Sequence, residues 1–441
     1  MKKVKRRTMS LMSLILAIAV GMSFYVYLYW TEGENWASFI SNSTVFKNGQ
    51  LAVGTVYDRN GMVLAAVRGD EREYNDSSLI RKATLHAVGD RYGNIGTGAL
   101  TAFAPQLIGY DPINGAYSVD GTGGKLTLSI DADLCAEAYE ALDGRKGAIG
   151  VMNYVTGEIV CMTSGASYDP YDPPDSFDSD YYEGVYINRL LSAAYTPGSV
   201  FKLVTLTAAI ETMPDLFDRT FTCEGSVEID GDWVTCTGYH GEIGIEEALA
   251  VSCNCAFARL ALDLGGERLA KYAERLGVTQ SHDINGLPTM EGVFEIAPEG
   301  SCDLAWSGIG QYDDQVNPAA MMRLSAAIAN GGRAVAPTLI KGESGGGERI
   351  MSGSTADKIA EMMNYNVHYT YGVDNYPGLE LYAKSGTAEV GSDRSPHAWF
   401  TGFIRDKNHP YAFVVMIENG GGGSSQAGAA ANRVLQAAVS K

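Results

Sequence analysis

The sequence has little positive charge for its length. It contains 33 Lys and Arg residues against 52 Asp and Glu residues, which gives a formal net charge of -19. Because proteins bind nucleic acids by neutralising phosphates with basic patches, this balance argues against nucleic acid as a partner. The first five basic residues precede any acidic residue and leave the rest of the chain more acidic still: Lys2, Lys3, Lys5, Arg6 and Arg7.

The seven cysteines lack the spacing of a zinc motif, because no Cys-x-x-Cys is found with a histidine pair. The sequence therefore predicts no metal and no cofactor. Cys223 and Cys236 lie on the two arms of an expected hairpin. Outside the membrane a disulfide between them is allowed, and free thiols are the alternative in a reducing setting. The other five are interpreted as packed residues and not as ligands: Cys135, Cys161, Cys253, Cys255 and Cys302.

Residues 9–30 contain no charged residue and are long enough for one bilayer crossing. The basic residues before this span place its N-terminal end in the cytoplasm, and an aromatic belt of Tyr25, Tyr27, Tyr29 and Trp30 ends it. A cleaved signal peptide is the alternative, but the span is long and no small-x-small cleavage site follows it. We expect an uncleaved single-pass anchor in the cell membrane, with the rest of the chain outside the cytoplasm.

Ser199 and Lys202 have the spacing of one helical turn. A Pro-Gly pair breaks the local structure just before Ser199, and the apolar run over 200–210 predicts a helix. Residues three apart share a helix face, so the hydroxyl and the amine can meet. Burial favours a neutral lysine amine, which can accept the proton of a serine nucleophile. An isolated Ser-x-x-Lys is also typical of an N-cap serine beside a solvated lysine, so the pattern needs further support.

Two further motifs supply that support, Ser252-Cys253-Asn254 and Lys384-Ser385-Gly386-Thr387. The order Ser-x-x-Lys, Ser-x-Asn and Lys-Ser/Thr-Gly is the motif set of penicillin-binding proteins and class A β-lactamases. On these residues the chain resembles the penicillin-recognising acyltransferases, and more narrowly the class B penicillin-binding proteins. The resemblance covers residues 126–441, with weaker echoes over 53–65 and 81–125.

The resemblance implies a membrane-anchored peptidoglycan D,D-transpeptidase that cross-links stem peptides through an acyl-serine and is inhibited by β-lactams. It implies that Ser199 is the nucleophile and Lys202 the base, while Ser252 relays a proton. Lys384 provides a cation near the substrate carboxylate, and the backbone amides of Ser199 and Thr387 form the oxyanion hole. The substrate-binding residues implied are Asn254, Ser385, Gly386 and Thr387.

The pattern of elements predicts an α+β fold in which helices sandwich an antiparallel sheet. Three regions are expected: a cytoplasmic tail and transmembrane anchor over 1–30, a short non-catalytic pedestal over 31–125, and a transpeptidase domain over 126–441. The pedestal, with about 95 residues, is too short for a glycan polymerase of ordinary domain size, so a polymerase is expected as a separate partner.

Several elements can be placed from the sequence. In the pedestal, residues 53–65 predict a hairpin around an Asn-Gly turn, and 81–110 predict mixed loops and short strands. Asp131 is expected to cap a helix. A hairpin is expected over 147–164, and strands over 379–387, 399–404 and 411–417. Further helices are expected over 245–264 with a break at 252–254, and over 267–276, 319–330 and 427–439.

Two alternatives stay open from the sequence. The first is a D,D-carboxypeptidase or β-lactamase of the same fold, with water as acceptor and a base concealed in the acidic loop over 169–183. That loop is also typical of an ordinary solvated surface loop. The second is a non-catalytic sensor that binds β-lactams or wall fragments.

Overall fold

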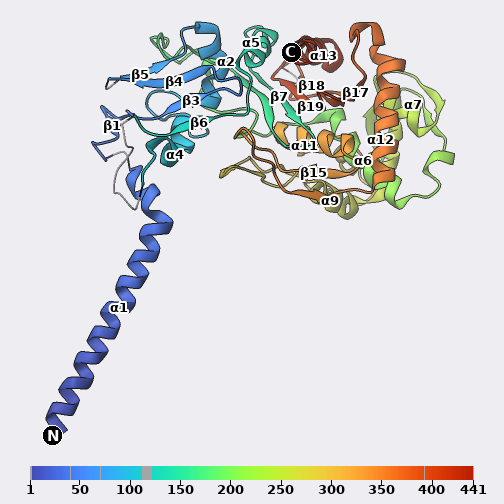
Figure 1. Ribbon diagram of the computed structural model, residues 1–441. Helices are drawn as coiled ribbons and strands as arrows, with labels where there is room; N and C mark the ends of the chain where they lie inside the picture. Colours follow the sequence, from blue (N-terminus) through green and yellow to red (C-terminus); the bar gives the residue numbers. More distant parts are fainter. Residues whose placement is uncertain (1, 40, 70, 112–121, 392, 441) are drawn as a thin grey trace.

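The computed structural model describes residues 2–39, 41–69, 71–111, 122–391 and 393–440. A long N-terminal helix, α1 (Lys2–Ala37), extends away from the rest of the chain (Figure 1). Among the described residues it provides the one segment, Lys2–Gly33, that is long and apolar enough to cross a membrane. Its residues 2–27 are exposed, as expected for side chains that would face lipid.

The region after α1 is built on a four-stranded sheet in the order β5-β4-β3-β6. The predicted hairpin is confirmed, because β3 (Thr55–Tyr57) and β4 (Val63–Arg68) pair antiparallel across the Asn-Gly turn. β5 (Glu71–Tyr74) extends this hairpin. β6 (Lys125–Thr127) pairs in parallel with β3, so this sheet crosses the boundary expected at residue 125.

The expectation of loops and short strands over 81–110 is wrong, because this segment is mainly helical. Its helices are α2 (Ser78–Val88), α3 (Ala99–Ala102) and α4 (Ala104–Ile108). The Ser77 hydroxyl caps α2 by accepting a hydrogen bond from the Ile80 N–H. α2 contacts β4 on one side and helix α5 (Ala132–Leu142) on another. A helix that is covered on several sides does not need a single apolar stripe. The 3.6-residue repeat of apolar residues in α2 is therefore weak.

The large region is organised around a five-stranded antiparallel sheet in the order β17-β18-β19-β7-β8. The two strands that precede the first motif, β7 (Gly147–Asn153) and β8 (Ile159–Gly165), form the expected hairpin. The last three strands of the chain complete the sheet: β17 (Leu381–Ala388), β18 (His397–Ile404) and β19 (Tyr411–Ile417). The N-terminal and C-terminal parts of the region therefore meet between β7 and β19.

Helices cover both faces of this sheet, as predicted. On one face, Ser325 of α11 (Pro318–Ala329) forms a hydrogen bond with Thr401 of β18 at 2.9 Å. A Cβ placed on Gly428 of α13 (Gly428–Val439) would contact the ring of Phe400 at 3.6 Å. Because successive strand residues point to opposite faces, Phe400 and Thr401 assign α13 and α11 to different layers. The α+β sandwich is confirmed.

The remaining helices are α6 (Lys202–Thr212), α7 (Ile245–Ala250), α8 (Asn254–Leu264), α9 (Gly266–Arg275), α10 (Cys302–Ser307) and α12 (Gly353–Asn366). Of these, α12 packs on both α11 and β17 (Figure 1). The others pack on α12 or on one another, with α6 and α7 against α12, α8 and α9 against α6, and α10 against α8. The capping role predicted for Asp131 is confirmed, since its side chain accepts a hydrogen bond from the Leu134 N–H at the start of α5. The short strands outside the two main sheets are β1 (Phe46–Lys47), β2 (Gln50–Leu51), β9 (Phe221–Cys223), β10 (Ser226–Ile229), β11 (Asp232–Thr235), β12 (Gly241–Ile243), β13 (Asp283–Ile284), β14 (Leu287–Pro288), β15 (Arg333–Val335) and β16 (Gly347–Arg349).

Candidate active site

Ser199 lies in a short 3-10 turn, Gly198–Val200, immediately before α6. Gly198 has a φ of 55°, a left-handed conformation that glycine adopts without strain. The Gly198 N–H donates to the Gly310 carbonyl at 2.8 Å, which ties the turn to the segment after α10. Ser199 is partly exposed, whereas its neighbours Gly198 and Val200 are buried. The turn therefore presents the serine from a fixed backbone.

Lys202 is fully buried at the first turn of α6. Its amine lies 2.7 Å from the Ser252 carbonyl oxygen, 3.2 Å from Ser252 Oγ and 2.8 Å from Asn254 Oδ1. The first two motifs, about fifty positions apart, are thus in direct contact.

We expected the Lys202 amine to contact the Ser199 hydroxyl, but no hydrogen bond joins these two described residues. The reason lies in the second motif, whose three oxygens surround the amine. In apo enzymes such catalytic hydrogen bonds are often absent and form when substrate binds. The arrangement holds Lys202 one turn from Ser199 without yet coupling the two.

The Ser-x-Asn motif occupies the break between α7 and α8, as the sequence predicted. Ser252 has a φ of 54°, which is rare for a residue other than glycine. The Asn254 side chain accepts from Lys202 through Oδ1 and donates from Nδ2 to the Thr235 carbonyl at 2.8 Å. Both ends of this amide are therefore engaged within the protein, and Asn254 orients the lysine.

The third motif lies on β17 and meets the second at Ser252. The fully buried Lys384 amine is 3.0 Å from Ser252 Oγ and 2.7 Å from the Ser385 carbonyl oxygen. The Ser252 hydroxyl therefore lies between two lysine amines. A hydroxyl can both accept and donate, so it can pass a proton from one amine to the other.

Tyr371, which sequence reasoning missed, fixes the orientation of Ser385. Its phenol donates to Ser385 Oγ at 3.1 Å and accepts from the Ser385 N–H at 2.8 Å. Tyr371 follows α12 in a helical segment with no recognisable motif. Only the tertiary fold, which packs this segment on β17, brings the two residues together.

Gly386 allows β17 and the turn that carries Ser199 to approach closely. A Cβ at this position would lie 2.9 Å from the Pro197 carbonyl oxygen and 3.1 Å from the Val200 nitrogen. On the other side of the contact, a Cβ on Gly198 would lie 2.6 Å from the Thr387 carbonyl oxygen. The two glycines therefore bring the Ser199 and Thr387 backbones side by side, as two amides of one oxyanion hole require.

We expect Gly386→Ala to slow acylation of Ser199 by about 100-fold, because displacement of a reacting group by about 1 Å has that effect. The added methyl group must push the Ser199 turn away from β17. The measurement is the rate of covalent labelling by a fluorescent penicillin. Gly346→Ala is the matched control, since a Cβ there meets no atom within 4 Å. An unchanged rate in Gly386→Ala would contradict the close-packing argument.

Burial controls the charge of both lysines. It lowers the pKa of the Lys202 amine to about 7, while the neighbouring thiols of Cys253, Cys236 and Cys255 oppose that shift. Burial likewise lowers the pKa of the Lys384 amine well below its usual value, and the positive charge of Lys202 lowers it further. At neutral pH the pair can hold an amine in the neutral form that a general base requires.

Cys223 and Cys236 are both free in the structure, which is the second of the two states that the sequence left open, and not the possible disulfide. The physical reason is that the two sulfurs also contact other side chains, His240 and Cys253. Cys223 Sγ lies 3.4 Å and Cys236 Sγ 3.6 Å from Nδ1 of His240, and Cys236 Sγ lies 3.8 Å from Cys253 Sγ. The sequence interpretation of Cys253 as a packed residue likewise missed this cluster.

The acidic loop over 169–183 is anchored to the N-terminal region. Asp169 forms an ion pair with Arg81 of α2 at 2.6 Å and accepts from Ser78 at 2.7 Å. At the other end, Glu183 pairs with Lys146 at 3.0 Å. These contacts give the loop a structural role, which weakens the hypothesis that it conceals a base for hydrolysis.

A comparison with protein-family models matches residues 147–438, more than half of the chain, to the "Penicillin binding protein transpeptidase domain". Among curated proteins, the peptidoglycan D,D-transpeptidase PbpA of Mycobacterium tuberculosis is 27% identical over 348 residues, which cover 70% of each chain.

Solved structures agree with the fold. The D,D-transpeptidase domain of a peptidoglycan glycosyltransferase from Eggerthella lenta has a TM-score of 0.73 at 26% identity, and the match covers 88% of this chain and 98% of that one. Penicillin-binding protein A from M. tuberculosis, as its penicillin G acyl-enzyme complex, has a TM-score of 0.74 at 24% identity, with 88% and 99% covered. The family-model match over residues 147–438 includes all three motifs.

Proposed function

The chain belongs to the penicillin-binding protein transpeptidase family, and from this premise we propose that it is a class B peptidoglycan D,D-transpeptidase. The observation that carries the proposal is the meeting of the three motifs. Ser252 links the amines of Lys202 and Lys384, and β17 lies against the turn that carries Ser199. The site thus combines a serine, two buried amines and the strand that carries the third motif. This combination suits acyl transfer from a peptide that ends in a carboxylate.

In the first step, Ser199 Oγ attacks the carbonyl carbon of the penultimate D-Ala of a donor stem peptide. The neutral Lys202 amine takes the Ser199 proton as the Oγ–C bond forms. The C–N bond then breaks, and the terminal D-Ala leaves with a proton relayed through Ser252, which lies 3.2 Å from the Lys202 amine. The backbone amides of Ser199 and Thr387 stabilise the developing oxyanion.

In the second step, the amine of a neighbouring stem peptide attacks the acyl-serine. An amide bond forms and the ester bond between Ser199 Oγ and the acyl carbon breaks. The proton that the attacking amine loses passes through the Lys202 amine to Ser199 Oγ, which restores the hydroxyl. Before the first step, Lys384, Ser385 and Thr387 hold the terminal carboxylate of the donor, which later departs with the leaving D-Ala, and Tyr371 keeps Ser385 in place. Asn254 acts mainly on Lys202, although Oδ1 keeps a second lone pair for a substrate N–H.

The domain plan and topology are part of the proposal. Residues 1–30 serve as cytoplasmic tail and anchor, 31–125 as pedestal and 126–441 as the transpeptidase domain. The five basic residues before the span support an N-terminus in the cytoplasm and a catalytic domain outside it. Glycan strands would come from a separate polymerase, and β-lactams would occupy the donor site.

The test uses the full chain in detergent micelles with a donor peptide ending in D-Ala-D-Ala and an amine acceptor. We expect release of D-Ala together with a donor–acceptor amide, and an acyl-enzyme with penicillin that persists for many minutes. Release of D-Ala without amide, or fast penicillin turnover, would instead identify a carboxypeptidase or β-lactamase. Acylation by penicillin with no turnover of the donor would identify a sensor.

A further inference from the structure

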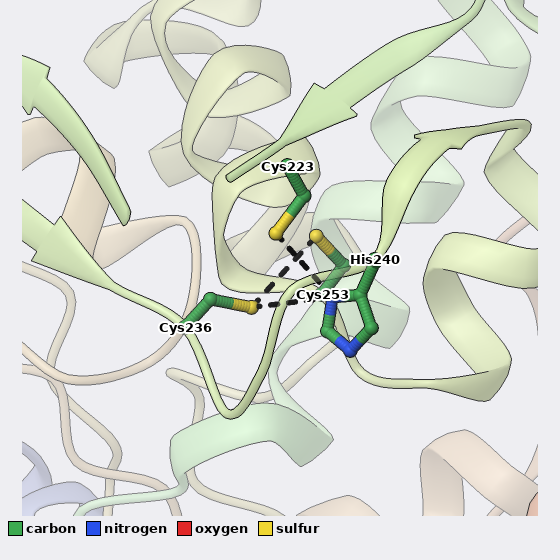
Figure 2. Close-up of side chains that lie close together, drawn as sticks. All are labelled: Cys223, Cys236, His240 and Cys253. Carbon is green, nitrogen blue, oxygen red and sulfur yellow. Dashed lines mark hydrogen bonds between the residues drawn. The ribbon is translucent and has the colours of Figure 1, made fainter. Parts of the chain in front are cut away.

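Four potential metal ligands converge at the Ser-x-Asn motif, whose middle residue, Cys253, is one of them (Figure 2). Cys223 ends β9, Cys236 follows β11, His240 precedes β12, and Cys253 lies between α7 and α8. Their ligand atoms, three sulfurs and an imidazole nitrogen, all lie within 4.8 Å of one another. Cys223 and Cys253 are buried, whereas Cys236 and His240 are partly exposed, so an ion can reach the cluster from solvent.

Three of the six distances between ligand atoms in the cluster match those of a coordination tetrahedron. Zn–S bonds of about 2.3 Å and Zn–N bonds of about 2.0–2.1 Å at tetrahedral angles separate two sulfurs by about 3.8 Å, and a sulfur from a nitrogen by about 3.6 Å. The sulfurs of Cys236 and Cys253 are 3.8 Å apart. His240 Nδ1 lies 3.4 Å from Cys223 Sγ and 3.6 Å from Cys236 Sγ.

The backbone around the cluster suits a thiolate. The Asn254 N–H donates to Cys236 Sγ at 3.2 Å, which stabilises a negatively charged sulfur. A further cysteine, Cys255, belongs to the same group of thiols but is outside the four whose ligand atoms lie mutually within 4.8 Å.

Residues 221–243 form a segment whose small sheets need a cross-link to be stable. Residues 221–243 form two separate two-stranded sheets, β9 with β12 and β10 with β11, of three or four residues a strand. An isolated two-stranded hairpin is marginally stable in water, and small units of this kind depend on metals or disulfides. A metal bound to all four residues would tie both sheets to the start of α8.

We propose that Cys223, Cys236, His240 and Cys253 bind a structural Zn²⁺ ion that fixes the second catalytic motif. Three thiolates and an imidazole with no open position form a structural zinc donor set, and thiolate-rich sites disfavour Mg²⁺ and Ca²⁺. Cys253 is the central residue of Ser252-Cys253-Asn254. The ion would therefore fix the two residues beside it, Ser252 and Asn254, which contact the Lys202 amine.

Zinc binding releases protons from the ligands. Three thiols lose their protons to solvent, the imidazole binds in its neutral form, and the Zn²⁺ complex carries a net charge of -1. No oxidant or reductant takes part. The sequence concealed the site because its ligands are separated by twelve, three and twelve residues, unlike the short Cys-x-x-Cys pairs of familiar zinc motifs.

The test measures metal in the full chain, purified in detergent micelles under reducing conditions from cells supplied with zinc. We expect about one tightly bound Zn²⁺ per chain, in keeping with a closed four-ligand site. Replacement by Co²⁺ should give the visible and near-ultraviolet bands of tetrahedral thiolate coordination. Because this spectrum is recorded on the unaltered chain, it does not depend on a variant that folds.

Variants then locate the metal. Cys223→Ser and His240→Ala should lose most of the zinc, whereas His240→Cys should keep the ion and shift the cobalt spectrum. Cys302→Ser, which removes a buried cysteine outside the cluster, should bind zinc like the parent chain. A chain without stoichiometric zinc would overturn the proposal, as would a disulfide between Cys236 and Cys253 found by mass spectrometry. If both single variants, Cys223→Ser and His240→Ala, kept their zinc, the ligand assignment would be overturned.

Chelation provides a functional readout. Zinc removal should slow acylation of Ser199 by up to about 100-fold, because a displaced Ser-x-Asn loop misplaces Lys202. Restoring zinc should restore the rate. An acylation rate unaffected by complete zinc removal would contradict the link between the ion and the second motif. The metal content itself is measured independently of the acyl transfer proposed above, so either proposal can fail alone.

Discussion

Ser199→Ala is expected to abolish covalent labelling by penicillin and release of D-Ala from the donor peptide. The replaced hydroxyl is the only atom that the mechanism uses to carry the acyl group, so no residual acyl-enzyme is expected. The Ser199 side chain makes no hydrogen bond to Lys202 and is partly exposed, so its loss should leave the thermal unfolding midpoint almost unchanged. Gel fluorescence after treatment with a labelled penicillin measures the first effect, and circular dichroism the second.

Ser179→Ala is a suitable control, because Ser179 is exposed and caps no helix through its side chain. This variant should label like the parent chain. Undiminished labelling of Ser199→Ala would show that another residue is acylated. That result would remove the nucleophile from the proposed mechanism while leaving the fold and family assignment intact.

Lys202→Met is expected to slow acylation by about 10²- to 10⁴-fold, the usual contribution of a general base. Methionine nearly preserves the volume of the buried chain, so packing around Phe257, which lies below the amine at 5.3 Å, should be retained. The Ser252 carbonyl and Asn254 Oδ1 lose their donor, which should cost about 1–3 kcal/mol of stability. The exposed Lys358→Met is the control and should be acylated at the parent rate.

The pH dependence separates a base from a merely structural lysine. Burial lowers the pKa of Lys202 to about 7, so the neutral amine is scarce below that pH and predominates above it. The acylation rate of the parent chain should therefore rise as pH increases through about 7 and then level off. The Lys384 amine is the group whose charge is coupled to that of Lys202, so this midpoint belongs to the pair of lysines.

Lys202→Met should lose this rise and show a low, nearly flat profile near neutral pH. A parent rate that is independent of pH on both sides of 7 would contradict Lys202 as the base. So would a variant that keeps the same midpoint, because the ionisation would then belong to another group.

Local sequence signals predicted most of the catalytic region. Short apolar runs identified the hairpin over 147–164 and the last three strands, because helices cover both faces of the sheet and bury nearly every residue of these strands. The interruption of helix 245–264 at Ser252 was also visible, since a Ser-x-Asn segment disfavours a helix interior. The antiparallel order, with β7 beside β19, could not be read from the chain, because strands separated by most of the domain pair there.

Helix α2 shows why the N-terminal region was harder. It is buried from Ala83 to Val88 and contacts both a strand and a helix. Tertiary contacts on several sides replace the single apolar stripe that a periodicity argument needs. The serine at its N-cap, Ser77, was a usable signal that the weak period obscured.

For the candidate site, the three motifs named the residues but not their partners. The predicted contact between Ser199 and Lys202 is absent, because Ser252 and Asn254 surround the amine. Tyr371 had no signal at all, since its role comes from the packing of its helical segment on β17. The cysteines had a misleading signal: spacing along the chain suggested one hairpin disulfide, whereas the fold adds His240 and Cys253 from outside that hairpin.

The most direct test of the central claim is to locate the acyl group in the parent chain. The full chain is treated with penicillin, digested, and analysed by tandem mass spectrometry. The account predicts one penicilloyl group per chain, on the Ser199 hydroxyl within the peptide that contains the Ser199–Lys202 pair. A penicilloyl group on any other serine, with Ser199 unmodified, would contradict it.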